Sequence, residues 1–336
     1  MSKPARLAAL FALAISPALA DTTVYGSARA ALNYRDDDAQ RTSWQIQNQS
    51  SRLGFRGAED LGRGLNALFQ YEFGVDVADG STLGGDSVGG RLSLVGLRSS
   101  QWGQLTLGRQ WDPYYFAVAG EVDTFNGDFS ANGYYANGGT TRGDNMLLYG
   151  SPSFLGGLQI FGAVQADGPA GDSDVDRWQI AAIYDRGPLF LGAGWAQVGE
   201  DVQGEGCGLS DGKRDGDKLN QYGAQGRYFF SNGIGLAGSV QKCDNNGSGR
   251  QKLDSTNVDL LVNYSFKTVR IQLGGYWREN RAGDGDLERA KLTGWILGFQ
   301  GRLSKRSRIW VEYGDSNSRA SNSDVRNVSI GMRHDF

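Results

Sequence analysis

The sequence has little of the chemistry on which most enzymes and metal proteins depend. It holds one histidine and two cysteines among 336 residues. A serine or cysteine nucleophile usually needs a histidine base, and a zinc site usually draws on histidine and cysteine ligands that lie close in sequence. The single histidine, His334, stands near the very end of the chain. We therefore expect no catalytic residue, no metal site and no cofactor.

The two cysteines, Cys207 and Cys243, are too few to staple a small disulfide-rich fold. Both lie in a part of the chain that we expect to be exported, where a disulfide is permitted. The sequence leaves two interpretations open. Cys207 and Cys243 either form one structural disulfide or remain as two free thiols.

A basic excess and a long apolar segment are also missing. The chain has 34 basic and 37 acidic residues, and its mean hydropathy is −0.43. Without a basic surplus, nucleic acid is not expected as a partner. Beyond the N-terminus, no apolar run approaches the ~20 residues that a membrane helix needs. A transmembrane β-barrel escapes this test, because only every second residue of its strands faces lipid.

The first 20 residues predict export. Lys3 and Arg6 precede an apolar stretch over residues 7–15, and the segment 18–20 (Ala-Leu-Ala) offers a small-residue cleavage site before Asp21. This order of regions is typical of a secretory signal peptide. We therefore divide the chain into a signal peptide (1–20) and a mature domain (21–336).

The mature domain is rich in glycine and aromatic residues, and its apolar residues recur at every second position. Glycine accounts for 51 residues, and Phe, Tyr and Trp together for 11%. The last nine residues alternate between apolar side chains and His334 at even positions (328–336) and polar or small ones at odd positions. Similar alternation marks the stretches 22–34, 257–266, 269–278 and 308–313. Such a pattern predicts strands with one apolar and one polar face.

The connectors between these stretches fall into two classes. Seven are short and eight are long and rich in Asp and Gly, which divides the mature domain into sixteen strands. All four prolines of the mature domain (Pro113, Pro152, Pro169 and Pro188) fall in connectors, where a missing N–H breaks no ladder. Short turns at one rim, long loops at the other and an even strand number are typical of bacterial outer-membrane barrels. We predict an all-β fold, a 16-stranded antiparallel transmembrane β-barrel whose last strand pairs with its first.

Several motifs resemble those of the Gram-negative general diffusion porins, in the branch common among beta-proteobacteria. They are SSRLGFRGAEDLGRGLNALFQYEF (50–73), GQLTLGRQWDP (103–113), LLYGSPSF (147–154), LSKRSRIWVEY (303–313) and the terminal GMRHDF. The resemblance covers the whole chain. It implies a homotrimer in the outer membrane, in contact with lipid and lipopolysaccharide, with the third long loop folded into the lumen. It also implies that the terminal Phe336 is read by the outer-membrane assembly machinery.

The third long connector, residues 111–143, has no clear periodicity and is rich in aromatic residues. Long loops in compact structures are usually functional, and disordered segments are poor in aromatics. We therefore expect this loop to pack inside the barrel as a constriction, with Glu121, Asp123 and Asp128 lining one side.

Arginines are expected on the opposite wall. Arg29, Arg52 and Arg56 alternate with apolar neighbours and so face the lumen. Arg109 shares a parity with apolar residues, which predicts that its strand ends or twists there; the porin resemblance places Arg52 and Arg109 in the basic cluster of the constriction.

The predicted function is passive diffusion of small hydrophilic solutes and ions through a water-filled pore, without catalysis. A basic wall that faces an acidic loop sets up a transverse field, and four arginines against three acids favour anions weakly. Two other functions stay open: a channel specific for one solute, and a surface binding or adhesion barrel.

Overall fold

The computed structural model describes residues 21–37, 40–81, 90–127, 141–166, 175–199, 218–245, 253–282, 290–318 and 323–336. The predicted signal peptide (1–20), Asp128, Pro169 and Cys207 lie outside these residues. The described part of the chain is almost entirely strand. Its elements are β1 (Asp21–Asp37), β2 (Gln40–Asn48), β3 (Arg52–Gly62), β4 (Leu65–Gly74), β5 (Gly90–Ser99), β6 (Gly103–Trp111), α1 (Pro113–Val118), β7 (Arg142–Gly150), β8 (Leu158–Ala166), β9 (Val175–Arg186), β10 (Leu189–Val198), β11 (Leu219–Phe229), β12 (Ile234–Asn245), β13 (Leu253–Phe266), β14 (Val269–Ala282), β15 (Ala290–Arg302), β16 (Ser307–Ser318) and β17 (Ser323–Asp335).

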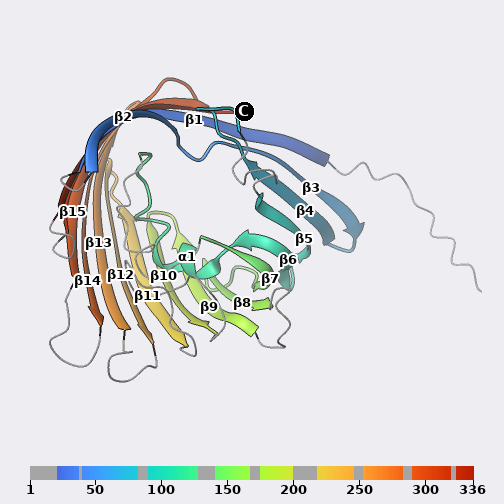
Figure 1. Cartoon of the computed structure of the whole chain (residues 1–336). Coiled ribbons are helices and arrows are strands. Elements are labelled where there is room, and N and C mark those ends of the chain that lie inside the picture. The colour runs from blue at the N-terminus through green and yellow to red at the C-terminus, as the bar shows by residue number, and fades with distance from the viewer. Residues whose placement is uncertain are drawn as a thin grey trace, which may run out of the picture.

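The strands form one closed antiparallel sheet, so the predicted 16-stranded barrel is confirmed (Figure 1). Apart from β2 and β3, consecutive strands of the described chain are paired, and β17 returns to pair with β1. The described residues contain seventeen strand segments because β2 and β3 both pair with β1 and together make one barrel strand. The break between them, at residues 49–51, was not predicted; Ser50 has a φ of 63° there.

The seam between the first and last strands closes through the C-terminal residue. The Phe336 N–H donates to the Gly26 carbonyl (3.1 Å), and the Gly26 N–H donates to the Phe336 carbonyl (3.0 Å). The Phe336 ring lies over Gly26, in space that a side chain at position 26 would fill. The last strand is therefore paired along both edges, with β16 on one side and β1 on the other, and this pairing closes the barrel.

The two faces of the sheet differ in polarity as the alternation predicts. On β13, Leu260 and Val262 are exposed on the outer face, whereas Asn257 and Asn263 are buried on the inner face. The same division holds on β17, where Ile330 and Met332 are exposed and Ser329 is buried. An apolar outer surface and a polar inner surface suit a barrel that stands in lipid and encloses water. No helix in the described part of the chain combines the length and apolarity needed to cross a membrane.

The short turns fall where the sequence predicts them. Pro152 lies between β7 and β8, and Pro188 lies between β9 and β10. Pro113 is the first residue of α1, a position that tolerates the missing N–H. The short helix α1 was not predicted, although Asp112 followed by Pro113 is a common helix start. Figure 1 shows α1 within the ring of strands.

The seam yields a test. A Cβ at position 26 would lie 2.6 Å from Cε2 of Phe336 and 2.9 Å from the backbone oxygen of Arg52. We expect Gly26→Ala to destabilise the barrel by about 1–3 kcal/mol, because the Arg52 backbone has little freedom to move. Gly162→Ala is the control, since no atom lies within 4 Å of a Cβ built there. Urea titration in detergent micelles measures both variants; equal midpoints would show that the seam is not tightly packed.

Candidate functional site

The segment that follows β6 begins at a buried ion pair. Asp112 caps α1, and its Oδ1 accepts from the Tyr114 N–H (2.9 Å). Its Oδ2 lies 3.2 Å from NH1 of Arg177 on β9 and accepts from Nε2 of Gln179 (3.2 Å). The side chains of Arg177 and Asp112 are 1% and 0% exposed. Because a buried charge is costly without its partner, this pair fixes the start of the segment to β9.

Helix α1 packs against small residues on the inner face of β9 and β10. Ala181 and Ala196 belong to one buried cluster with Tyr114. A Cβ at Gly194 would lie 3.0 Å from Cδ2 of Tyr114, so the glycine makes room for the ring. Burial raises the pKa of Tyr114 above its ordinary value. The phenol is therefore neutral at physiological pH and contributes mainly packing.

The residues after α1 contact one strand after another around the inner wall. The Glu121 N–H donates to Oε1 of Gln225 on β11 (2.9 Å), and the Thr124 hydroxyl donates to Oε1 of Gln272 on β14 (3.3 Å). At the described end of the segment, Glu312 on β16 accepts from the backbone N–H groups of residues 126 (2.9 Å) and 127 (2.6 Å). Residues 112–127 therefore follow the inner face from β9 to β16. That the whole loop 111–143 narrows the lumen stays a prediction, because 128–140 lie outside the described residues.

The acids predicted for the constriction have partners of their own. Glu121 forms an ion pair with Arg227 on β11 (2.9 Å), and Asp123 accepts from the Tyr115 hydroxyl (2.6 Å). Asp128 lies outside the described residues. Of the described acids on this side, Glu121 is thus ion-paired, whereas the contact of Asp123 with Tyr115 is a hydrogen bond that leaves its charge in place.

A row of inward-facing arginines lies on the other part of the wall. We call these residues the arginine row: Arg308 (β16), Arg333 (β17), Arg29 (β1), Arg52 (β3) and Arg91 (β5). The first three are direct neighbours in the sheet register, since Arg333 is the partner of both Arg308 and Arg29. Arg52 is the register partner of Ser27, two residues from Arg29.

Two carboxylates accompany the arginine row. Glu72 on β4 forms an ion pair with Arg91 (2.6 Å) and lies 3.8 Å from NH1 of Arg52. Asp335 contacts Arg333 (2.7 Å) and Arg308 (3.0 Å). Among these described residues, five guanidinium groups meet two carboxylates, so the row carries surplus positive charge.

The row includes two of the four predicted arginines, Arg29 and Arg52, and three that the prediction missed. Arg308 and Arg333 each alternate with exposed apolar residues, so the parity that identified Arg29 also marks these two. Arg91 was missed because its neighbour Leu92 is buried as well, which hides the alternation.

The other two predicted arginines lie outside the row. Arg56 is exposed, with its guanidinium 5.1 Å from the centre of the Tyr25 ring. Arg109 stands at the expected irregularity, a register shift after Gly108, but it forms an ion pair with Asp144 and donates to the Gly90 carbonyl (2.9 Å). Its register partner Ser93 shares the face of the exposed Val95. The structure therefore separates Arg109 from the arginine row.

Cys243 lies at the end of β12 and is disulfide-bonded and fully buried. The sequence has one other cysteine, Cys207, which lies outside the described residues.

The cysteines allow a simple check. We expect the denatured protein to migrate faster on a gel before reduction than after it, because a bond between Cys207 and Cys243 keeps a chain loop closed. Thiol titration of the denatured, unreduced protein should find no free thiol. Equal mobility together with two free thiols would reject the bond.

The buried ion pair gives a second test. Arg177→Met leaves the Asp112 carboxylate buried without its guanidinium, and we expect a loss of about 3–5 kcal/mol in the free energy of unfolding. Adding Asp112→Asn removes the orphaned charge but keeps an oxygen that can cap α1. The double variant should therefore be more stable than Arg177→Met in a denaturant titration. If the second substitution only adds to the loss, the two charges are not coupled.

Comparisons with known proteins agree with this architecture. A family model described as Gram-negative porin matches residues 7–336. An outer membrane porin of Bordetella pertussis is 28% identical over the full length of both chains. Outer membrane porin protein 32 of Delftia acidovorans is 33% identical over 59% of this chain and 60% of its own.

Solved structures show the same fold. The anion-selective porin from Comamonas acidovorans superposes with a TM-score of 0.78 at 21% identity, covering 94% of this chain and all of that one. The trimer form of OmpT, an outer membrane protein of Vibrio cholerae, has a TM-score of 0.71 at 14% identity and covers 94% of this chain and 99% of its own. The chain belongs to the Gram-negative porin family and is a protein of the outer membrane.

Proposed function

We propose that this porin forms a water-filled channel for passive diffusion of small hydrophilic solutes and ions, narrowed between the loop segment that includes residues 112–127 and the arginine row. A single observation carries this proposal: the two features occupy complementary parts of the inner wall. The segment contacts the wall from β9 to β16, and the row runs from β16 through β17, β1 and β3 to β5. A solute that crosses the barrel must then pass between them.

The charges favour anions. The arginine row holds five guanidinium groups against Glu72 and Asp335, whereas on the segment's side Glu121 is paired with Arg227 and Glu312 accepts backbone N–H groups. The arginine row therefore presents surplus positive charge to the gap, and a charged rim lining a narrow aqueous path selects ions of opposite sign. The likeness in fold to an anion-selective porin is consistent with this lean.

No bond is made or broken in this function. Polar solutes and their hydration waters are oriented in the field between the row and the segment, and solutes wider than the gap are rejected. Transport follows the concentration gradient, and no catalytic residue or cofactor is required.

We further propose that the porin is a homotrimer in contact with outer-membrane lipid and lipopolysaccharide. Residues 1–20 would direct its export and then be removed. The trimer form of Vibrio cholerae OmpT, which shares the fold, supports the assembly. The terminal Phe336 stays half exposed at the seam, where the outer-membrane assembly machinery can reach it before the barrel closes.

Planar-bilayer recording under a salt gradient tests the proposal. Arg29 makes no ion pair with a described residue, so Arg29→Gln removes one positive charge from the row without orphaning an acid. At about 10 Å in water a unit charge is worth ~0.4 kcal/mol, which changes the permeability of each ion about twofold, in opposite directions for anion and cation, so the anion-to-cation permeability ratio should fall about fourfold. Lys305→Gln, in the exposed turn between β15 and β16, makes the same charge change away from the row and should leave the reversal potential unchanged.

The other outcomes separate the remaining functions. If Arg29→Gln and Lys305→Gln give the same reversal potential, the row does not line the narrowest point. A channel blocked by one solute at low concentration would favour a solute-specific pore. A folded protein that never conducts would favour a binding or adhesion barrel.

A further inference from the structure

A strip of apolar residues crosses four neighbouring strands on the largely polar inner wall of the barrel. The strip consists of Ala237 (β12), Leu261 (β13), Gly274 (β14) and Ile296 (β15), each the register partner of the next. We call it the inner strip. Apolar residues at lumen-facing positions of a water-filled barrel need a cover, because water would otherwise contact them. The loop segment supplies that cover.

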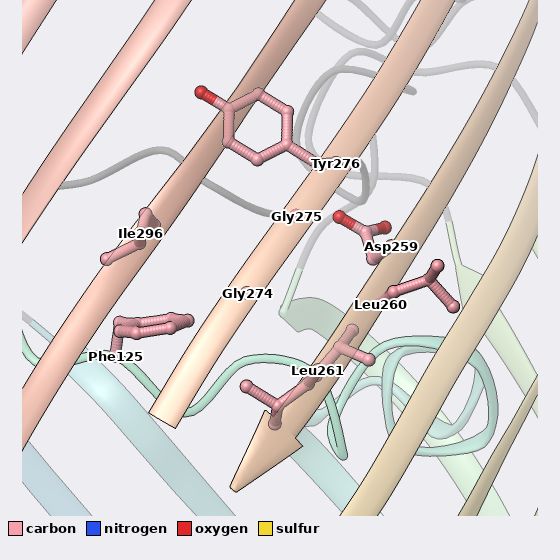
Figure 2. A pocket seen from close by; sticks show the side chains of 9 residues that line it. Phe125, Asp259, Leu260, Leu261, Gly274, Gly275, Tyr276 and Ile296 are labelled. Atoms are coloured by element: carbon pink, nitrogen blue, oxygen red, sulfur yellow. The ribbon is translucent and has the colours of Figure 1, made fainter. Parts of the chain in front are cut away.

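Two loop side chains meet the inner strip. Val122 is buried together with Ala237 and Leu261, and Phe125 packs against the same cluster. Figure 2 shows Phe125 beside Gly274 and Ile296, on the same side of the sheet as Leu261. The apolar part of the loop is therefore matched to the apolar part of the wall.

Gly274 leaves a notch that the Phe125 ring fills. A Cβ built at position 274 would lie 2.6 Å from Cε2 and 3.0 Å from Cζ of Phe125. The next glycine, Gly275, faces the other side of the sheet, and the nearest atom to a Cβ there is the Gly294 oxygen at 3.9 Å. A methyl group at position 274 would thus clash with the Phe125 ring, whereas a methyl group at position 275 would make only an ordinary contact.

The cavity next to the Phe125 ring is too small to take the ring. The cavity beside it, bounded by Val122, Phe125, Asp259 and Tyr276 among others, has a volume of about 20 Å³ (Figure 2). That volume holds a single water and is far below the ~150 Å³ of a cavity that binds benzene. A ring displaced from the notch must therefore move away from the wall.

We propose that Gly274 is a size-determining residue of the channel, because the notch it leaves sets how far Phe125 and the loop segment around it stand from the wall. This inference rests on the proposed pore between the segment and the arginine row. Carbon atoms in contact are ~3.5–4.0 Å apart, so a methyl at position 274 shifts the ring by about 1 Å. Phe125 directly precedes Asn126, so the shift also reaches the hydrogen bonds that Glu312 accepts.

The test compares two single-methyl substitutions at adjacent positions. We expect Gly274→Ala to lower the single-channel conductance in planar bilayers and to abolish liposome permeation by the largest neutral sugar that the unsubstituted channel passes. Gly275→Ala should match the unsubstituted channel in both measurements. Equal behaviour of the two variants in conductance and sugar cut-off would overturn the proposal.

A double-substitution cycle identifies Phe125 as the mediator. Once Phe125→Ala removes the ring, the methyl at position 274 has nothing to displace, so Gly274→Ala should change the conductance no further in that background. An equal drop in both backgrounds would overturn the proposal. If Gly274→Ala alone fails to fold, recovery of folded barrel by Phe125→Ala supports the contact, and failure to recover contradicts it.

The controls also keep this inference separate from the proposed function. A folded, unsubstituted protein that does not conduct defeats the channel itself. A conducting protein in which both alanine variants behave alike defeats only the role of Gly274.

Discussion

Closure of the hydrogen-bonded sheet is the constraint on which the rest of the structure depends. Within hydrocarbon each unpaired backbone N–H or C=O group costs several kcal/mol, so a spanning sheet must leave no edge. Here β17 meets β1, and the paired backbone groups of Gly26 and Phe336 complete the ring. Once the ring is closed, strict alternation sends one set of side chains to lipid and the other to an enclosed aqueous space. The lumen-facing side chains therefore contribute, with the polar loops, to the low mean hydropathy of the chain.

The lumen is asymmetric. Neighbouring arginines on β16, β17 and β1 repel one another, and the carboxylate of Asp335, which contacts Arg308 and Arg333, offsets part of this repulsion. The facing part of the wall carries glutamines, small residues and the inner strip, and these hold the loop segment. One part of the wall thus carries the positive charge of the arginine row, and the other part holds the loop segment in place.

Much of the fold could be predicted because strand periodicity, turn residues and proline positions are local signals. The contacts of the loop could not, because they join residues far apart in sequence: Asp112 with Arg177, and Asn126 with Glu312. Some signals were nevertheless present. Leu261 interrupts the alternation of β13 by adding an apolar residue on the polar side, and Ile296 does the same on β15. Arg109 forms its ion pair with Asp144 rather than with a carboxylate of the arginine row, and its place in the constriction stays a prediction.

The central claim is that the closed sheet encloses an open aqueous path. Liposomes that contain the purified, folded protein and are placed in iso-osmotic sugar solutions measure this most directly. The account predicts swelling whose rate falls steadily as the sugar becomes larger and reaches zero at a definite size. Liposomes that stay sealed to the smallest sugars, with the protein shown to be folded, would contradict it.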